Sequence, residues 1–325
     1  ETFGNSGTLT ATTVTNAGTF ENTETFSAPA VTNSGAYING GDFNATDVEN
    51  TGTSTFDNTG TLNASNSITN AGTFTNDTTG TLTTINTVTN SGAYINGGDF
   101  NATDVENTGT STFDNTGTLN ASNSITNAGT FTNNTTGTLT AINTVTNSGA
   151  YINGGDFNAT DLENTGTSTF DNTGTLNASN SVTNAGTFET SETFSAPFVN
   201  NSGTFTNTGT FTSINNVVNS GTFANNGTLT LTTVNNTATI ENNETFSATT
   251  VTNSGTFTNS KSFTANDVEN TLTFGNTGTL NTINTVTNSG TFTNEGSFNA
   301  TDVDNTLTFG NTGTLTANNS VTNSG

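Results

Sequence analysis

A short repeat runs through the whole chain and limits what it can fold into. Cutting after each V-x-N-like triplet divides residues 1–323 into eighteen units of 17, 18 or 20 residues, the first of them incomplete. One unit is SGTFTNTGTFTSINNVVN, residues 202–219. A hydrophobic content of only 28% is typical of disordered chains. The strict order of the repeat instead predicts a solenoid, in which units too short to bury a core alone do so by stacking.

Three apolar columns run through the units. The first column is aromatic except at Ile240, the second is Phe or Leu, and the third is Val, Ile or Leu. One unit contributes Phe205, Phe211 and Val217 to these columns. Each apolar residue lies between polar ones, and this period of two predicts a short strand with one buried face. We therefore expect three strands per unit, joined by turns.

The predicted fold class is all-β, a three-sided parallel β-helix (β-solenoid) of about 18 coils of 17–20 residues, with a right-handed winding favoured. Coils about 4.8 Å apart would give a rod of roughly 85 Å. We predict one repetitive domain over residues 1–325. Near-identical 57-residue blocks occupy residues 34–90 and 91–147, and residues 148–184 form a partial third copy. Such duplication favours a role in length rather than a unique active site.

Asparagine forms two further columns. One Asn follows the first apolar position by two residues in every unit but one, where Thr190 stands. Another Asn follows the third apolar position by two residues in all units, and these are Asn16, Asn33, Asn50, Asn70, Asn90, Asn107, Asn127, Asn147, Asn164, Asn184, Asn201, Asn219, Asn236, Asn253, Asn270, Asn288, Asn305 and Asn323. We expect both columns to turn inward at corners and to hydrogen-bond along the stack as Asn ladders. Asn also tolerates the left-handed backbone that tight corners require.

The charge is one-sided, with 25 acidic residues against the single basic Lys261. Nucleic acids are excluded as partners, because binding them requires Lys and Arg to neutralise phosphates. The absence of Cys rules out disulfides and thiol chemistry. No apolar run approaches the roughly 20 residues of a membrane span, so we expect no membrane insertion within this segment.

Paired carboxylates recur in a D-V-[ED]-N-like motif and could hold structural Ca²⁺, which prefers oxygen ligands. These candidate metal ligands are Asp47, Glu49, Asp104, Glu106, Asp161, Glu163, Asp267, Glu269, Asp302 and Asp304. The alternative is a solvated acidic patch that keeps the protein soluble. No other cofactor is expected.

Two other functions are compatible with some of the residue types. Paired carboxylates also serve glycosidases. The chain has no His, Arg or Trp to bind a substrate, so we expect no enzymatic activity. Outward Thr triplets suggest an ice-binding solenoid, but the array around Thr73–Thr75 is broken in the next unit at Ala93-Tyr94-Ile95.

The strings NSGTFTNTGTFTS, NTGTLNASNSITN and TNSGTFTNEGSFNATDVDN resemble the passenger repeats of bacterial autotransporter and filamentous-haemagglutinin-type adhesins. The resemblance covers essentially the whole chain and implies right-handed parallel β-helices displayed on cell surfaces. We therefore expect an extracellular structural or adhesive fibre or stalk. Its expected partners are other copies of itself, assembled head-to-tail or laterally, or a surface receptor or glycan. The alternatives are an ice-binding solenoid and a polysaccharide-acting phage or cell-wall fibre.

The two chain ends together complete one unit. Ser324-Gly325 placed before residues 1–16 gives SGETFGNSGTLTATTVTN, a unit of an allowed length. Solenoids normally carry caps, because an open end exposes strand edges. We therefore expect this chain to be a segment of a longer rod or one subunit of a head-to-tail filament.

Overall fold

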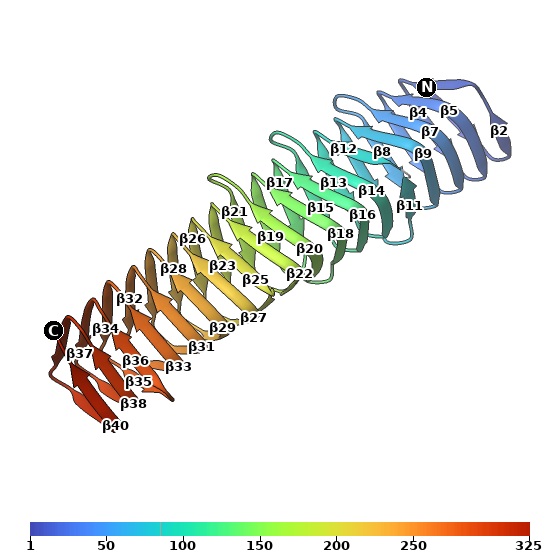
Figure 1. Ribbon diagram of the computed structural model, residues 1–325. Helices are drawn as coiled ribbons and strands as arrows, with labels where there is room; N and C mark the ends of the chain where they lie inside the picture. The colour runs from blue at the N-terminus through green and yellow to red at the C-terminus, as the bar shows by residue number, and fades with distance from the viewer. Residues whose placement is uncertain (85) are drawn as a thin grey trace. The chain divides into compact units, whose positions relative to one another are not determined.

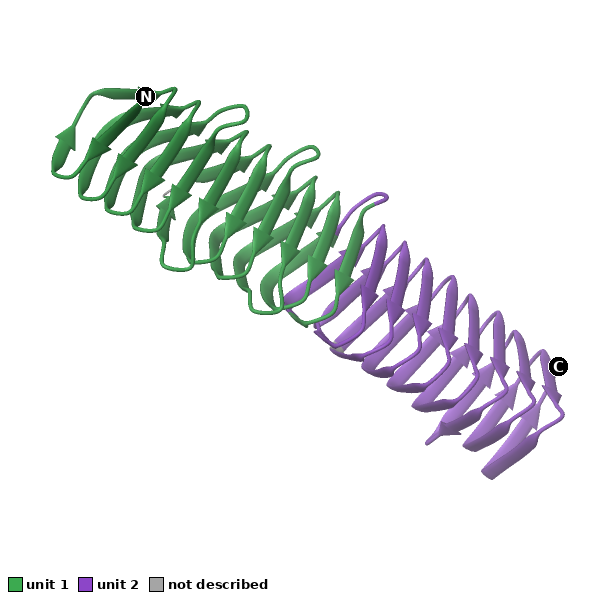
Figure 2. Cartoon of the chain, turned by 180° about the vertical axis from the view of Figure 1, so that it is seen from behind, with its two compact units in different colours: residues 1–163, 168–176 green, residues 164–167, 177–325 purple. Residues whose placement is uncertain are grey.

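A computed structural model describes residues 1–84 and 86–325, apart from the side chain of Ile214, and every regular element in it is a β-strand. Figure 1 labels strands along the chain, and the chain divides into two compact units (Figure 2). Unit 1 comprises residues 1–163 and 168–176, and unit 2 comprises residues 164–167 and 177–325. Each unit is a stack of parallel β-coils, which confirms the predicted β-solenoid. No helix in the described residues is long and apolar enough to cross a membrane.

Short strands that carry the aromatic column form one parallel sheet in each unit. Neighbours pair without slippage, so Phe74 lies beside Tyr94 and Tyr94 beside Phe113. In unit 1 these strands are β1 (Thr2–Asn5), β4 (Thr19–Asn22), β6 (Ala36–Asn39), β8 (Thr55–Asn58), β10 (Thr73–Asn76), β13 (Ala93–Asn96), β15 (Thr112–Asn115), β17 (Thr130–Asn133), β19 (Ala150–Asn153) and β21 (Thr169–Asn172). In unit 2 they are β23 (Thr187–Thr190), β26 (Thr204–Asn207), β28 (Thr222–Asn225), β30 (Thr239–Asn242), β32 (Thr256–Asn259), β34 (Thr273–Asn276), β37 (Thr291–Asn294) and β39 (Thr308–Asn311).

The second and third columns lie in most coils on one continuous strand rather than on the two separate strands expected. In most of these coils a small residue stands between the columns, as the buried Ala45 does in β7, although β29 has Leu231 there, and no turn interrupts the strand. These strands are β5 (Thr25–Asn33), β7 (Asp42–Asn50), β9 (Thr61–Asn70), β14 (Asp99–Asn107), β16 (Thr118–Asn127), β18 (Thr138–Asn147), β20 (Asp156–Asn164), β22 (Thr175–Asn184), β27 (Thr210–Asn219), β29 (Thr228–Asn236), β31 (Thr245–Asn253), β33 (Ser262–Asn270), β38 (Ser297–Asn305) and β40 (Thr314–Asn323).

Four coils keep two separate strands in this segment. The pairs are β2 (Thr8–Thr10) with β3 (Thr13–Asn16), β11 (Thr81–Thr84) with β12 (Thr87–Asn90), β24 (Thr193–Ser195) with β25 (Phe198–Asn201), and β35 (Thr279–Thr282) with β36 (Thr285–Asn288). Their second and third apolar residues still pair in register with those of the neighbouring coils, as Leu82 does with Phe100 and Val88 with Val105.

The core of each unit is built from the three predicted columns. Phe205, Phe211 and Val217 are buried, as expected. In unit 1 the aromatic rings stack face to face along the coils. The rings of Tyr94 and Phe113 lie 4.7 Å apart at 3°, and those of Phe113 and Phe131 do the same. The ring spacing equals the spacing of the strands that carry the rings, so each coil adds one ring to the pile.

Both Asn columns form buried hydrogen-bonded ladders. The Nδ2 of Asn107 donates to Oδ1 of Asn127 at 2.8 Å, and Asn127 donates to Asn147 at the same distance. Asn127 Nδ2 also donates to the carbonyls of Gly129 and Ala150, so its amide joins its own corner to the next coil. Where Thr190 replaces Asn, Oδ1 of Asn207 is buried without a partner. The predicted ladder is therefore confirmed along with its one exception.

The expectation of left-handed Asn corners was wrong. No described residue other than glycine has a positive φ, and the three that do are Gly52, Gly109 and Gly166. The corner Asn residues keep ordinary backbone geometry, because their side chains rather than an αL turn satisfy the corner carbonyls. At Gly92, glycine has a different, steric role. A Cβ on Gly92 would lie 2.1 Å from the carbonyl oxygen of Gly72 in the preceding coil.

We predict that Asn127→Ala lowers the free energy of unfolding by about 3 kcal/mol, because each buried group left without a partner costs about 1–3 kcal/mol. Asn120→Ala is the control, since it removes an Asn–Asn bond, with Asn101, at an exposed position. Denaturant unfolding of both variants checks this. Equal losses would contradict a dominant role for the buried ladder.

Candidate functional site

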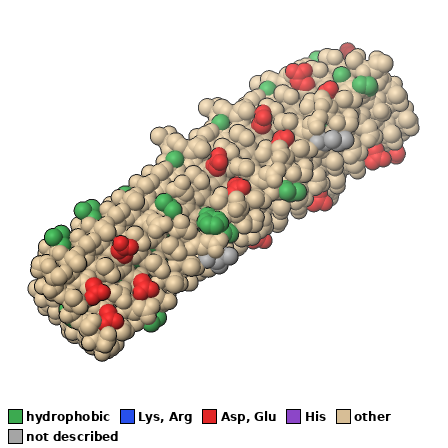
Figure 3. All heavy atoms as spheres, in the orientation of Figure 1, with side chains coloured by type: hydrophobic (Ala, Val, Ile, Leu, Met, Phe, Trp, Pro, Cys, Tyr) green, Lys and Arg blue, Asp and Glu red, His purple; other side chains and the backbone are tan. Residues whose placement is uncertain are grey.

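The recurring carboxylate pairs occupy equivalent places in β7, β14, β20, β33 and β38. In each motif the residue between the carboxylates is a buried Val or Leu, and the carboxylates themselves face outward. The Asp is partly covered in every case, whereas Glu49, Glu106, Glu163 and Glu269 are exposed. On the face drawn in Figure 3, the acidic side chains lie scattered among neutral ones.

The Asp of the pair accepts hydrogen bonds from the next coil. Oδ1 of Asp104 accepts from Nδ2 of Asn123 at 2.7 Å, from the backbone N–H of Ser124 at 3.1 Å, and from the Ser124 hydroxyl at 2.5 Å. Asp47 accepts in the same way from Asn66 at 2.7 Å and Ser67 at 2.6 Å. Asp47 and Asp104 thus both bond to polar residues one coil away.

Unit 2 repeats this contact. Asp302 accepts from Asn319 at 2.8 Å and from the Ser320 hydroxyl at 2.5 Å. Asp267 faces Asn284 at 3.4 Å and the backbone N–H of Thr285 at 3.3 Å. These Asp carboxylates therefore act as hydrogen-bond acceptors between neighbouring coils.

A difference in coil length explains the contact. The Asp stands in a strand of nine residues, such as β14, and the coil above it has ten in the same segment, as in β16. The register between β14 and β16 shifts between Ala102 and Asp104 to admit the extra residue. An extra residue bulges outward and leaves backbone and side-chain donors without ladder partners. The Asp beneath the bulge accepts from these donors.

Where a ten-residue segment follows another ten-residue segment, the lower coil has no Asp before its third-column residue. The bulge residues of the two coils then hydrogen-bond to each other. Asn143 Nδ2 donates to Oδ1 of Asn123 at 2.8 Å, and Asn86 donates to Asn66 at 2.8 Å. The donors at these bulges, Asn66, Asn123, Asn284 and Asn319, were not singled out from the sequence. The sequence signal that identifies them is an N-[ST] pair one coil after each D-V-[ED]-N or D-L-E-N motif.

Hydrogen bonds shift the titration of one of these carboxylates. The Ser320 hydroxyl, followed by the Asn319 amide, holds the pKa of Asp302 below its ordinary value, against a smaller opposing effect of burial. Hydrogen bonds to a carboxylate favour its charged form. The Asp is therefore best suited to its contact when it is ionised.

The proposal of structural Ca²⁺ at these pairs gains no support from the geometry. No group of three or more His, Cys, Asp or Glu side chains placed to hold a metal occurs in residues 1–84 and 86–325. Ca²⁺ takes six to eight oxygen ligands. Oδ1 of Asp47, Asp104 and Asp302 already accepts protein hydrogen bonds. Structural Ca²⁺ at these ten carboxylates therefore stays a prediction.

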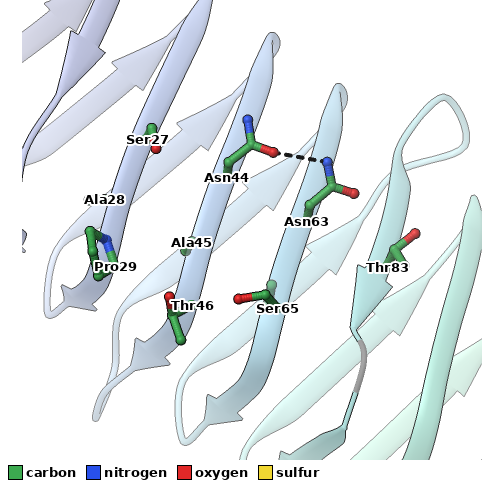
Figure 4. Close-up of a pocket in the computed structure, with 10 residues that line it drawn as sticks. Ser27, Ala28, Pro29, Asn44, Ala45, Thr46, Asn63, Ser65 and Thr83 are labelled. Carbon is green, nitrogen blue, oxygen red and sulfur yellow. Dashed lines mark hydrogen bonds between the residues drawn. The ribbon is translucent and has the colours of Figure 1, made fainter.

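A shallow groove lies over the small buried residues of unit 1 (Figure 4). It has a volume of 460 Å³ and lies across strands β5, β7 and β9. Asn63 donates across it to Asn44 at 3.1 Å. Its lining residues are Ser27, Ala28, Pro29, Asn44, Ala45, Thr46, Asn63, Ala64, Ser65 and Thr83. A second hollow of 320 Å³ repeats the arrangement over Ala102 and Ala121. Neither lining contains a charged or aromatic side chain that could serve as an acid, base or stacking platform.

The sequence also gives no sign that the hydroxyl groups of three tyrosines are buried. The hydroxyls of Tyr37, Tyr94 and Tyr151 are buried and make no hydrogen bond within the described structure. Burial raises the pKa of all three phenols well above the ordinary value. They stay neutral and stack as rings with their Phe neighbours, as Tyr94 does with Phe74 at 4.9 Å. Their place in the core favours packing rather than chemistry.

In comparisons with known proteins, no family model, curated protein or solved structure matches this chain. Any inference about function therefore depends on the residues and their geometry.

We predict that Asp104→Ala destabilises the protein by about 1–3 kcal/mol, because three donors of the β16 bulge lose their acceptor. Glu106→Ala removes the neighbouring carboxylate from the same strand and should change stability by less than about 0.5 kcal/mol. Thermal unfolding with and without added Ca²⁺ measures both. A Ca²⁺-dependent rise in melting temperature that both substitutions abolish would instead establish a metal site.

We also predict a pH effect at Asp302. Its pKa is lower in the folded protein than in the unfolded chain, so its contribution to stability is present above the unfolded pKa, near 4, and is lost as pH falls through the folded pKa. Asp302→Asn should remove that part of the acid dependence of the melting temperature. Asp304→Asn removes a carboxylate from the same strand and leaves Ser320 and Asn319 in place. The two variants having the same acid profile would contradict this assignment.

Proposed function

We propose that this protein is an extracellular structural and adhesive element, a fibre or stalk of stacked β-coils that does no catalysis. The observation that carries the proposal is the repetition of one outer surface along unit 1. The same side chains return at intervals of 57 residues, which is three coils. A repeated surface suits length and many weak contacts, whereas catalysis needs one constellation of groups.

The repeated surface is visible on the outward side of the short strands. Ile38, Ile95 and Ile152 are 38%, 39% and 40% exposed, so their environments are nearly the same. Each pairs in register with an Asp of the next coil, Asp57, Asp114 or Asp171. An apolar side chain beside a carboxylate thus recurs every three coils, which is about 14 Å. This spacing allows one partner surface to contact several equivalent sites, which strengthens attachment through multivalency.

The resemblance to autotransporter and filamentous-haemagglutinin-type adhesin repeats supports the same proposal, with right-handed coils and display at a cell surface. The partners that we propose are a surface receptor or glycan, or further copies of the chain assembled end to end or side by side. Nucleic acid is not a partner, because a net charge of −24 repels phosphate.

A block deletion tests the proposal. Removing residues 91–147 joins Asn90 to Ser148, which reproduces the natural Asn147-Ser148 junction and takes out three whole coils. Displayed on a non-adherent bacterium, the full chain should increase attachment to host-cell layers over an empty display vector. The deletion variant should retain part of that attachment, because equivalent surfaces remain. No attachment by the full chain, or complete loss on deletion, would contradict a multivalent adhesive fibre.

A further inference from the structure

In unit 2, one outward face differs from the others. It belongs to the part of each coil that carries the second apolar column. Eight strands, β24, β27, β29, β31, β33, β35, β38 and β40, each present two outward residues on either side of a second-column Phe or Leu. We call this set the hydroxyl face. Its members are Thr193, Ser195, Thr210, Thr212, Thr228, Thr230, Thr245, Ser247, Ser262, Thr264, Thr279, Asn281, Ser297, Asn299, Thr314 and Thr316.

The hydroxyl face is a regular lattice. Thr210 pairs in register with Thr228, Thr228 with Thr245, and Thr245 with Ser262. The second row runs in the same way through Thr212, Thr230, Ser247 and Thr264. Rings beneath the neighbouring sheet, such as those of Phe257 and Phe274, repeat at 4.8 Å from coil to coil. Two residues along a strand add about 6.6 Å. Hydroxyls therefore recur at about 4.8 Å in one direction and about 6.6 Å in the other.

Charge is segregated away from this lattice. The described residues of the hydroxyl face include no carboxylate and no amine. The outward face of the short strands carries Glu189 and Glu241, and the third segment carries the acidic motifs of β33 and β38. Glu192, Glu244 and Lys261 stand at the corner beside the face rather than on it. In a chain of net charge −24, a face of this extent without a carboxylate is a distinct surface.

Unit 1 offers the contrast. Its equivalent face is interrupted every third coil by Asp42, Asp99 and Asp156, which take the place of the first Thr. Asp99 pairs in register with Thr81 on one side and Thr118 on the other, so the fold accepts a carboxylate at this position. The uninterrupted array in unit 2 is therefore not required by the fold.

We propose that the hydroxyl face of unit 2 binds the surface of ice. The coil-to-coil repeat of the face lies close to the shorter oxygen repeat of the ice lattice, so rows of hydroxyls can hold water in an ice-like arrangement while Thr methyls fill the gaps between water molecules. Ordered water bridges polar groups nearly as well as a direct contact. Carboxylates would bind water more strongly and in another geometry, and none is present on the face.

Two other occupants fit the face less well. A crystalline polysaccharide favours aromatic platforms for its sugar rings, and the outward residues of the hydroxyl face are only Thr, Ser and Asn. A second copy of the chain would gain little from the contact, because hydrated hydroxyls bury little apolar area. The proposal for ice does not depend on the adhesive function.

The test is thermal hysteresis of the full chain, measured by nanolitre osmometry with single ice crystals. Thr228→Asp combined with Thr279→Asp places carboxylates three coils apart and so copies the interruption found in unit 1. The matched control is Ala224→Asp with Gly275→Asp. It adds the same charge three coils apart on the short-strand face, where Asp57 and Asp114 stand in unit 1. A Cβ on Gly275 would make only ordinary contacts, the nearest at 3.7 Å.

We expect hysteresis and faceted ice crystals with the unmodified chain and with the control, and loss of both with the Thr228→Asp/Thr279→Asp variant. Circular dichroism and melting temperature verify that all three proteins are folded. Absence of hysteresis in the unmodified chain, or equal hysteresis in the two variants, would overturn the proposal. So would a concentration-dependent dimer in sedimentation velocity that only the Thr→Asp variant abolishes, because the face would then be a contact between copies.

Discussion

Hydrogen bonding from each coil to the next is the interaction on which the rest of this structure depends. A single coil of 17–20 residues buries too little apolar surface to offset the entropy of ordering it. Stacking supplies a parallel backbone ladder and, at two corners of the coil, a buried Asn that bonds up and down. The Asn side chains of the ladder also donate hydrogen bonds to corner carbonyls and accept them from corner N–H groups, which have no partner in a strand. Replacing the amide by Thr at residue 190 leaves an orphaned oxygen on Asn207, which shows how closely each rung relies on its neighbour.

Because the coils stack in register, a difference in coil length has to be accommodated at the outer surface. A ten-residue segment above a nine-residue segment must expel one residue, and the Asp of the coil below binds the donors that this bulge exposes. The acidic motif thus recurs beneath bulges of this kind, whereas Phe198 takes the position of the Asp beneath the longer segment of β27. Acidic residues that suggest a metal site in the sequence act here as acceptors between coils, and the companion Glu stays in solvent.

A stack that satisfies its own interior leaves its outer faces free to vary, and the two units use that freedom differently. Unit 1 repeats an exposed Ile beside an Asp every three coils. Unit 2 has instead an uncharged array of Thr, Ser and Asn through eight strands. The first pattern favours multivalent attachment and the second favours contact with a regular lattice of water. Both consist of side chains that contribute little to the core, which is why they can differ while the coils remain alike.

The sequence alone predicts the β-solenoid class, the three buried columns and the inward Asn positions, because period-two alternation and a regular repeat establish which residues share a face. It could not determine that the second and third strands join at a small residue, since the same spacing permits a turn at Ala45. It also could not assign the partners of Asp47 or Asp104, because these lie 19 or 20 residues away and meet only when coils stack. These points follow from how the coils stack, and stacking also places the uncharged residues of unit 2 on one face. Alternation shows which side chains point outward, whereas stacking register decides which of them lie next to one another.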